Sequence, residues 1–247
     1  MKIIIAPAKK MIVDTDIFAA ETTPLYLTEA NQLLTQLRQL TFTELKALWH
    51  CSDQLATANY QRLLKMNLTT DLTPAIMAFT GLQYQYMAPD LFTTTALEYV
   101  NSNLRILSGF YGSLRPFDGI TAYRLEMQAP LQIGHTTNLY QFWGNKIYSA
   151  LAINNEPVIN LASNEYAKTI RPYLQPNEVF IDIIFGQLIE GKVKTKATLA
   201  KMARGEMVRY LAENNVQTLA ELKQFNHLNY QFQAQLSTST KLVFIQK

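Results

Sequence analysis

The sequence predicts an α/β fold, a single compact unit with mixed α+β elements in which a central sheet carries peripheral helices and hairpins. Short apolar or β-branched runs alternate along the chain with segments whose apolar residues recur at helical spacing. No repeat, low-complexity block or Gly/Ser-rich linker divides the 247 residues. We therefore expect one domain, residues 1–247, with one continuous core.

Four apolar runs are expected to form buried strands, at 3–6, 105–108, 158–162 and 179–185. The first delivers Lys9 and Lys10 just past its carboxyl end. The second runs into a tight loop at 109–112, where two glycines permit a sharp turn. A hairpin turn is predicted at 190–191, and two strands around a Ser/Thr-rich turn are predicted within 230–247.

Helices are expected at 28–65 (three short ones), 95–104, 137–152, 164–171 and 198–214. Thr41 and Glu44 have capping-box spacing, and Ser52 and Ser163 are candidate N-caps. Gly205 lies inside the last helix, where glycine costs about 1 kcal/mol relative to alanine. We therefore expect something to approach the backbone closely at this position.

The composition excludes a disordered chain, because 48% of the residues are hydrophobic and 17% are charged. The net charge of +3 is too small to identify a nucleic-acid or membrane partner by itself. The first ten residues hold an apolar stretch too short for a signal peptide, and no run approaches 18 apolar residues. We expect a soluble, cytoplasmic protein with no membrane partner.

The sequence offers few ligands for a tight metal site. Cys51 is the only cysteine, which excludes an intramolecular disulfide and a CxxC zinc site. His50, His135 and His227 are too widely spaced for an HExxH helix. We predict no metal site and no cofactor, and a weak carboxylate site is the alternative that remains.

Polar residues follow three of the predicted strands, at 9–10, 108–124 and 163–168. Ligands of α/β sheets collect beyond the carboxyl ends of strands, so a cleft is expected there. Arg115 and Arg124 could each present a planar fork to a carboxylate or phosphate. Two structural alternatives stay open: Arg115 could hold a turn by pairing with Asp118, and 123–126 could alternate as a strand.

The segment 191–209 concentrates positive charge, with six Lys or Arg residues against Glu206 alone. Lys201 and Arg204 are i, i+3 neighbours on one helix face and could meet phosphates. The alternative is a solvated edge strand whose lysines, at 192, 194 and 196, discourage aggregation between sheets.

Five motifs, in the same order, resemble the YaaA family of peroxide stress proteins over nearly the whole chain. They are 6–9 (APAK), 104–127 (LRILSGFYGSLRPFDGITAYRLEM), 139–144 (LYQFWG), 159–166 (INLASNEY) and 203–205 (ARG). The resemblance implies a cytoplasmic protein of the peroxide response, associated with lowering free iron and protecting DNA and proteins from oxidative damage. It also implies a distinctive α/β fold, a positively charged cleft and DNA binding, for which a helix-hairpin-helix element has been proposed.

The resemblance also implies which residues form the cleft. Those expected to bind a nucleic acid or another anion are Lys9, Arg115, Arg124, Lys201 and Arg204. The other cleft positions are Ser108, Tyr111, Asp118, Tyr123, Glu126, Asn160, Ser163, Glu165, Tyr166 and Gly205. No reaction is established for the family, so a binding protein is favoured over an enzyme.

The chain departs from the family pattern at three positions. Thr80 and Met202 stand where the family usually has lysine, and Ala6 replaces a serine. The loss of two positive charges lowers the DNA affinity that we expect. Gly81 is the one glycine in its region, so the sequence itself does not show the glycine hairpin of a helix-hairpin-helix.

Two functional hypotheses follow from these residues. In the first, the protein binds DNA through phosphate contacts, without base specificity, and helps to limit iron-dependent oxidative damage. In the alternative, an enzyme or binding protein takes a small phosphate-containing, nucleotide-like ligand, because Glu126, Glu165 and Asp118 accompany arginine and tyrosine side chains. Direct iron sequestration is a weaker third hypothesis, since it would rely on oxygen ligands alone.

Overall fold

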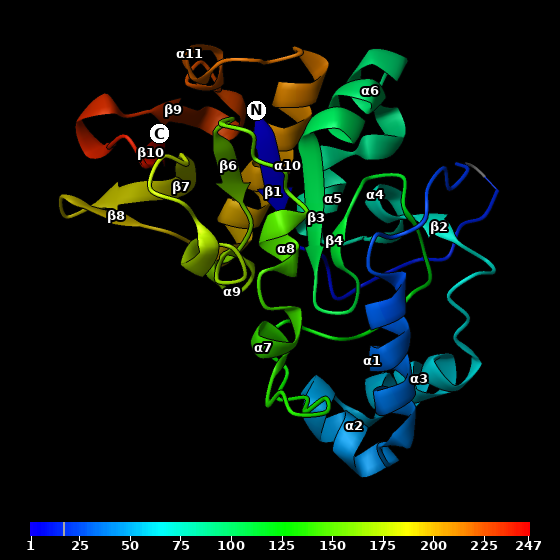
Figure 1. Cartoon of the computed structure of the whole chain (residues 1–247). Helices are drawn as coiled ribbons and strands as arrows, with labels where there is room; N and C mark the ends of the chain where they lie inside the picture. The colour runs from blue at the N-terminus through cyan, green and yellow to red at the C-terminus, as the bar shows by residue number, and fades with distance from the viewer. Residues whose placement is uncertain (17) are drawn as a thin grey trace.

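The computed structural model of the chain describes residues 1–16 and 18–247 (Figure 1). The strands are β1 (Lys2–Ile5), β2 (Thr73–Pro74), β3 (Leu104–Ser108), β4 (Gly112–Leu114), β5 (Gly119–Ile120), β6 (Val158–Leu161), β7 (Phe180–Ile189), β8 (Lys192–Lys194), β9 (Tyr230–Phe232) and β10 (Lys241–Gln246). The helices are α1 (Leu27–Gln39), α2 (Phe42–Trp49), α3 (Asp53–Lys65), α4 (Ala75–Ala78), α5 (Leu82–Met87), α6 (Thr94–Asn103), α7 (Leu139–Trp143), α8 (Lys146–Ser149), α9 (Asn164–Ala167), α10 (Ala197–Glu213) and α11 (Leu219–Leu222). Four 3₁₀ turns are η1 (Pro89–Leu91), η2 (Arg171–Tyr173), η3 (His227–Asn229) and η4 (Ala234–Leu236).

The predicted α/β class is confirmed, with a mixed central sheet of eight strands within the described residues. The strand order is β4-β3-β1-β6-β7-β10-β9, and β8 pairs with β7 outside this path. The inner strands β3, β1, β6, β7 and β10 run parallel, whereas β4, β8 and β9 are antiparallel additions at the edges. Ile3 of β1 pairs with Leu104 on one side and Ile159 on the other. The carboxyl ends of β1, β3 and β6 therefore meet at one edge of the sheet.

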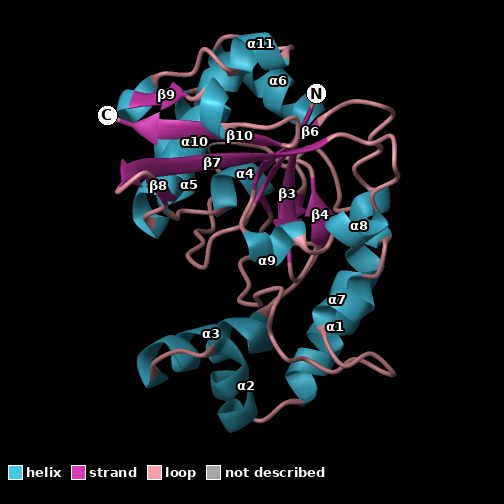
Figure 2. Ribbon diagram, turned by 90° about the vertical axis from the view of Figure 1, so that its left-hand side faces the viewer, coloured by secondary structure: helices cyan, strands magenta, loops and turns pink. Residues whose placement is uncertain are grey.

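Helices cover both faces of this sheet. In two perpendicular views, α5, α6 and α10 lie on one face and α8 and α9 lie toward the other, whereas α7 lies beyond the ends of the strands (Figures 1 and 2). The helix α10 packs against α5, α6 and β7. Both faces of the inner strands are thus removed from water, which explains why Ile3, Ile4 and Ile5 form a continuous apolar run rather than an alternating one.

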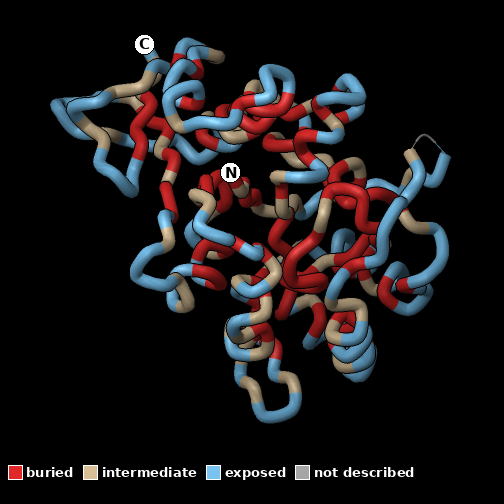
Figure 3. Tube along the Cα trace, turned by 45° about the horizontal axis from the view of Figure 1, so that its top comes forward, coloured by how far each residue is buried: buried red, intermediate tan, exposed pale blue. Residues whose placement is uncertain are grey.

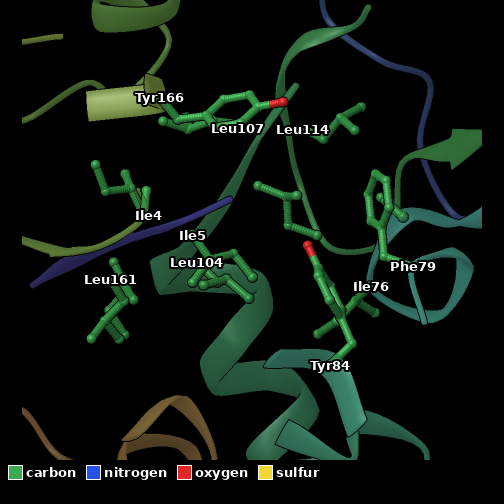
Figure 4. Packing of buried hydrophobic residues seen from close by; sticks show 14 of the residues in the cluster. Ile4, Ile5, Ile76, Phe79, Tyr84, Leu104, Leu107, Leu114, Leu161 and Tyr166 are labelled. Atoms are coloured by element: carbon green, nitrogen blue, oxygen red, sulfur yellow. The ribbon is translucent and has the colours of Figure 1, made fainter. Parts of the chain in front are cut away.

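The core is continuous from the sheet into the helices. Figure 3 shows buried residues in the centre of the molecule and exposed turns around it. Figure 4 shows Tyr84 and Tyr166 entering the core from α5 and α9, beside Ile5 and Leu107 of the sheet. The helices α1, α2 and α3 project from one end of the sheet (Figure 2), and their buried side chains, such as Leu33 and Leu45, belong to the same cluster.

Most predicted elements are confirmed, including the three short helices within 28–65, the hairpin at 190–191 and the two C-terminal strands. The capping box at Thr41 and Glu44 is present. Ser52 and Ser163 occupy N-cap positions, but neither side chain makes a cap hydrogen bond.

Two helix predictions were too long, and one strand alternative was wrong. The segment 137–152 forms the separate helices α7 and α8, because Gly144 between them adopts φ = 49° and ends the first. The helix predicted at 164–171 ends at Ala167. Residues 123–126 form a loop rather than a strand.

The expectation of a close backbone approach at Gly205 is confirmed. A Cβ atom added there would lie 2.1 Å from the carbonyl oxygen of Gln83 in α5. Glycine therefore lets α10 pack directly against the backbone of α5. Across residues 1–16 and 18–247, no helix is long and apolar enough to cross a membrane.

Candidate functional site

A pocket of about 380 Å³ lies beyond the carboxyl ends of β1 and β6. Segments that are far apart in the sequence form its wall: residues 6–10, 81–84, 123–126, Ser163, Glu165 and Tyr166 at the start of α9, and Lys201 and Arg204 of α10. The pocket thus occupies the place where α/β sheets commonly bind ligands.

Local packing holds these wall segments together. The hydroxyl of Tyr84 donates to the carbonyl oxygen of Ala6 at 3.0 Å, which ties α5 to the segment after β1. At Gly81 an added Cβ would lie 2.8 Å from the Cβ of Ala8, and at Gly109 it would lie 2.7 Å from the carbonyl oxygen of Leu125. Both glycines therefore permit close contacts between segments that are far apart in the sequence.

Positive charge predominates in the pocket wall. Five cationic side chains line it (Lys9, Lys10, Arg124, Lys201 and Arg204), against the two carboxylates of Glu126 and Glu165. The ammonium group of Lys9 lies 2.8 Å from a carboxylate oxygen of Glu126. The side chains of Lys9, Lys10 and Lys201 are exposed at the rim, so an approaching anion would meet them first.

Deeper in the pocket, three polar side chains keep buried N–H groups without a partner. They are Nε2 of Gln83, Nε of Arg124 and Nε of Arg204. Arg124 makes one bond through its other guanidinium nitrogens, to the carbonyl oxygen of Trp49 at 3.3 Å. Burial lowers the pKa of the Arg204 guanidinium, and nearby Asp182 opposes this effect. An arginine side chain nevertheless stays charged at physiological pH. Buried donors without acceptors are rare in folded proteins and call for a ligand or water.

Three tyrosines, Tyr84, Tyr123 and Tyr166, form the aromatic part of the wall. The hydroxyl of Tyr123 is 2.7 Å from Oγ of Ser108, so buried Ser108 fixes the position of this wall residue by a hydrogen bond. Burial raises the pKa of Tyr84 and of Tyr166 well above the ordinary tyrosine value. These side chains therefore stay neutral, and with 3–7% of their surface exposed they belong mainly to the core behind the pocket.

Glu165 is the carboxyl group of the pocket with a shifted pKa. Burial raises its pKa, a hydrogen bond from the backbone N–H of Gln128 opposes the shift, and the charge of Glu126 raises it further. Nearby Lys9 opposes the shift weakly. The proton on Glu165 is therefore retained to a higher pH than on an ordinary glutamate.

Lowering the pH is expected to strengthen anion binding in this pocket through Glu165. Protonation removes one negative charge, which is worth about 1 kcal/mol at ~4 Å in water, so affinity should rise several-fold as the pH falls through the raised pKa. Oligonucleotide affinity measured at fixed salt between pH 7.5 and 5 tests this. Glu165→Gln should flatten the profile, whereas Glu190→Gln on the exposed β7-β8 hairpin should not. An unchanged profile in Glu165→Gln would contradict the assignment.

A family model described as peroxide stress protein YaaA matches residues 1–236. The chain belongs to this family. It is 60% identical over 245 residues to a UPF0246 protein of Lactiplantibacillus plantarum, covering 99% of each chain. It is 58% identical over 245 residues to a UPF0246 protein of Pediococcus pentosaceus, covering 99% of this chain and 98% of the relative. Membership of this peroxide stress family supports a role in the stress response, as the sequence motifs suggested.

The structure of this YaaA family member brings together nine of the predicted site residues. They are Lys9, Tyr123, Arg124, Glu126, Ser163, Glu165, Tyr166, Lys201 and Arg204. They come from the segments that follow the parallel strands β1 and β6, from the loop after β5, and from the helix α10.

Arg115 and Asp118 lie outside the pocket wall, in the ion pair that was the structural alternative. The guanidinium NH2 of Arg115 is 2.8 Å from Oδ1 of buried Asp118 and 2.8 Å from the carbonyl oxygen of Thr23. This pair joins the loop after β4 to the segment before α1, so its geometry is that of a structural clamp. Arg115 thus lies outside the wall of this pocket, and its predicted contact with an anion stays a prediction.

Four other predicted residues support the pocket from outside its wall. Ser108 and Tyr111 are buried, and Oη of Tyr111 accepts from the N–H of Thr121 at 3.2 Å. Asn160 donates to Oδ1 of Asp182 at 2.7 Å. Gly205 lies beneath α5, as described above.

Sequence reasoning missed Gln83 and Tyr84 as wall residues. A signal was present, because Thr80 and Gly81, two positions already compared with the family pattern, lie just before them. The strip of lysines at 192, 194 and 196 is exposed and lies outside the pocket wall. The first two belong to the edge strand β8 as expected, whereas Lys196 is the N-cap residue of α10. Among the described residues, no cluster of three or more His, Cys, Asp or Glu side chains could hold a metal ion.

Proposed function

We propose that this protein acts in the peroxide stress response by binding the phosphate backbone of DNA across the rim of the pocket, without reading bases, and so limits iron-dependent oxidative damage. The observation that carries the proposal is the convergence of five cationic side chains from three separate segments on one pocket. Three of these, Lys9, Lys10 and Lys201, are exposed, so they can contact a DNA duplex that stays outside the pocket. Such phosphate contacts give affinity without sequence preference.

DNA binding of this kind offers a physical route to protection from iron. The double helix holds a condensed atmosphere of cations, and protein lysines and arginines displace those cations from the phosphates they contact. Ferrous ions in that atmosphere would otherwise react with peroxide beside the DNA. Displacement moves this reaction away from the strand, so no iron ligands are required in the protein itself.

Replacing the three rim lysines by glutamine is expected to weaken DNA binding and to flatten its salt dependence. Each lost phosphate contact lowers the slope of log affinity against log salt by about 1, so the triple variant should lose up to about 3. Fluorescence polarisation of a labelled duplex across a salt series measures this slope. Damage by ferrous ion and peroxide to the same duplex should then be reduced by the unmodified protein and less by the variant.

The exposed lysine strip of the β7-β8 hairpin provides a matched control. Replacing lysines 192, 194 and 196 by glutamine removes the same charge from residues outside the pocket wall. That variant should retain most of the slope. An equal loss in both variants would refute the rim as the binding surface, and salt-insensitive binding would favour the small phosphate-containing ligand instead.

A further inference from the structure

Met11 holds three separate segments of the chain together. Its backbone forms an isolated antiparallel bridge with Phe79, and backbone hydrogen bonds of 2.9 and 3.0 Å flank this bridge. Its sulfur atom, Sδ, accepts a hydrogen bond from the backbone N–H of Tyr123 at 3.4 Å. The ring of Tyr123 packs edge-on against the ring of Phe79, with centroids 6.3 Å apart. The three segments therefore meet at one methionine side chain.

The bond to Sδ is the weakest part of this arrangement. A thioether sulfur is a weak hydrogen-bond acceptor. Tyr123 is buried, and the described residues offer its backbone N–H no second acceptor. Residues 121–126 belong to no helix or strand, so no regular ladder of hydrogen bonds holds this loop if the bond is lost. A buried N–H that loses its acceptor destabilises the structure around it.

Met11 is also one of the few methionines that solvent can reach. Of the eight methionines, five retain no more than 8% of their accessible surface: Met1, Met66, Met87, Met127 and Met207. The partly exposed ones are Met11, Met77 and Met202. Among the described methionines, Met11 is the one whose sulfur accepts a hydrogen bond. A reagent in water therefore reaches a sulfur atom on which the local structure depends.

We propose that Met11 is a site of oxidation by hydrogen peroxide, and that its oxidation releases the loop 121–126. A lone pair of Sδ attacks one peroxide oxygen, the O–O bond breaks and an S–O bond forms. The second oxygen takes up a proton and leaves as water. Sulfur loses two electrons and peroxide gains them, so the products are methionine sulfoxide and one water molecule.

Oxidation changes the sulfur from an acceptor into a group that repels the N–H of Tyr123. The sulfur of a sulfoxide carries a positive partial charge, and the side chain becomes polar. The new oxygen atom can accept the N–H only if the segments move apart, because the present contact of 3.4 Å leaves no room for an oxygen between sulfur and nitrogen. In both cases the loop separates from Met11.

The inference does not depend on DNA binding. The segments that Met11 joins continue into 6–10 and 123–126, which are parts of the pocket wall. Peroxide alone would thus alter the wall, with no ligand bound. In a protein of a peroxide stress family, this would couple the oxidant directly to the conformation.

The test treats the purified protein with hydrogen peroxide and locates the added oxygen by peptide mass spectrometry. We expect oxygen on Met11, a melting temperature lowered by about 5 °C, and amide hydrogen exchange about tenfold faster in the peptide that spans 121–126. A methionine sulfoxide reductase should reverse both changes. The reductant without the enzyme is the control, because it restores an oxidised Cys51 but not a sulfoxide.

Variants separate Met11 from the other partly exposed methionines. Met11→Leu should show no change of melting temperature or hydrogen exchange on peroxide treatment. The double variant Met77→Leu/Met202→Leu is the matched control and should respond as the unmodified protein does. If Met11→Leu does not fold, the reductase experiment on the unmodified protein decides the question without it.

Several outcomes would overturn the inference. No oxygen on Met11, under conditions that oxidise Met77 and Met202, would refute the site. Oxidation of Met11 with unchanged exchange in 121–126 would refute the release of the loop. A full response in Met11→Leu, or one that the reductant alone reverses, would assign the effect to another residue.

Discussion

Replacing Gly205 by alanine is expected to lower the free energy of unfolding by about 3 kcal/mol, at the upper end of the usual cost of overpacking. The added Cβ would lie 2.1 Å from the carbonyl oxygen of Gln83 and 2.9 Å from the amide nitrogen of Met87, both backbone atoms of α5. Backbone atoms cannot rotate away, so α5 and α10 must separate. Alanine improves helix propensity by about 1 kcal/mol, which offsets only part of this cost.

Thermal and urea unfolding measure the effect. A change of 1 kcal/mol shifts the melting temperature by about 2–4 °C in a chain of this size. Gly134→Ala is the matched control, because Gly134 has φ = 55° and no atom within 4 Å of an added Cβ. It should cost about 1 kcal/mol from backbone strain alone. A smaller loss for Gly205→Ala than for Gly134→Ala would contradict the close packing of α5 against α10.

Gly205 also illustrates how much of the fold the sequence could predict. A glycine inside a helical pattern signals a close approach, and the structure confirms it. The sequence could not name α5 as the partner, because the contact depends on how two distant helices pack on one face of the sheet. Local signals such as the capping box at Thr41 were sufficient to predict where a helix begins. The break at Gly144 was not predicted, because the apolar residues keep their helical spacing on both sides of it.

The candidate site was predictable to the extent that it follows strand ends. Parallel strands bring Lys9 and Ser163, which follow β1 and β6, to one edge, so their position in the sequence was informative. Glu126 reaches the same pocket from a loop after β5. Strand ends do not reveal which way each side chain points, however. Asn160 belongs to the same edge but bonds to Asp182 outside the pocket wall. Gln83 was missed because it belongs to a six-residue helix without a distinctive apolar stripe.

Asp118→Asn is expected to destabilise the protein by about 3 kcal/mol and to leave DNA binding by the folded protein unchanged, because hydrogen bonds to a charged group contribute about 1.5–3 kcal/mol. The buried carboxylate accepts from the N–H of Arg115 at 2.8 Å, from Nε of Arg115 at 3.0 Å and from Oγ1 of Thr22 at 2.7 Å. All of these groups donate. An asparagine replaces one carboxylate oxygen by an NH2 group: in place of Oδ2 it opposes the N–H of Arg115, and in place of Oδ1 it opposes both Nε of Arg115 and Oγ1 of Thr22.

Urea unfolding of Asp118→Asn and of Asp90→Asn, an exposed matched control in η1, measures the difference in stability. Duplex binding is then measured at a temperature where both variants are folded. The salt slope should equal that of the unmodified protein, since neither Asp118 nor Arg115 lines the pocket. Normal stability with an altered slope would instead assign this ion pair to the DNA surface. The combination of lost stability and retained slope would establish that the pair of Arg115 and Asp118 serves the fold and not the DNA surface.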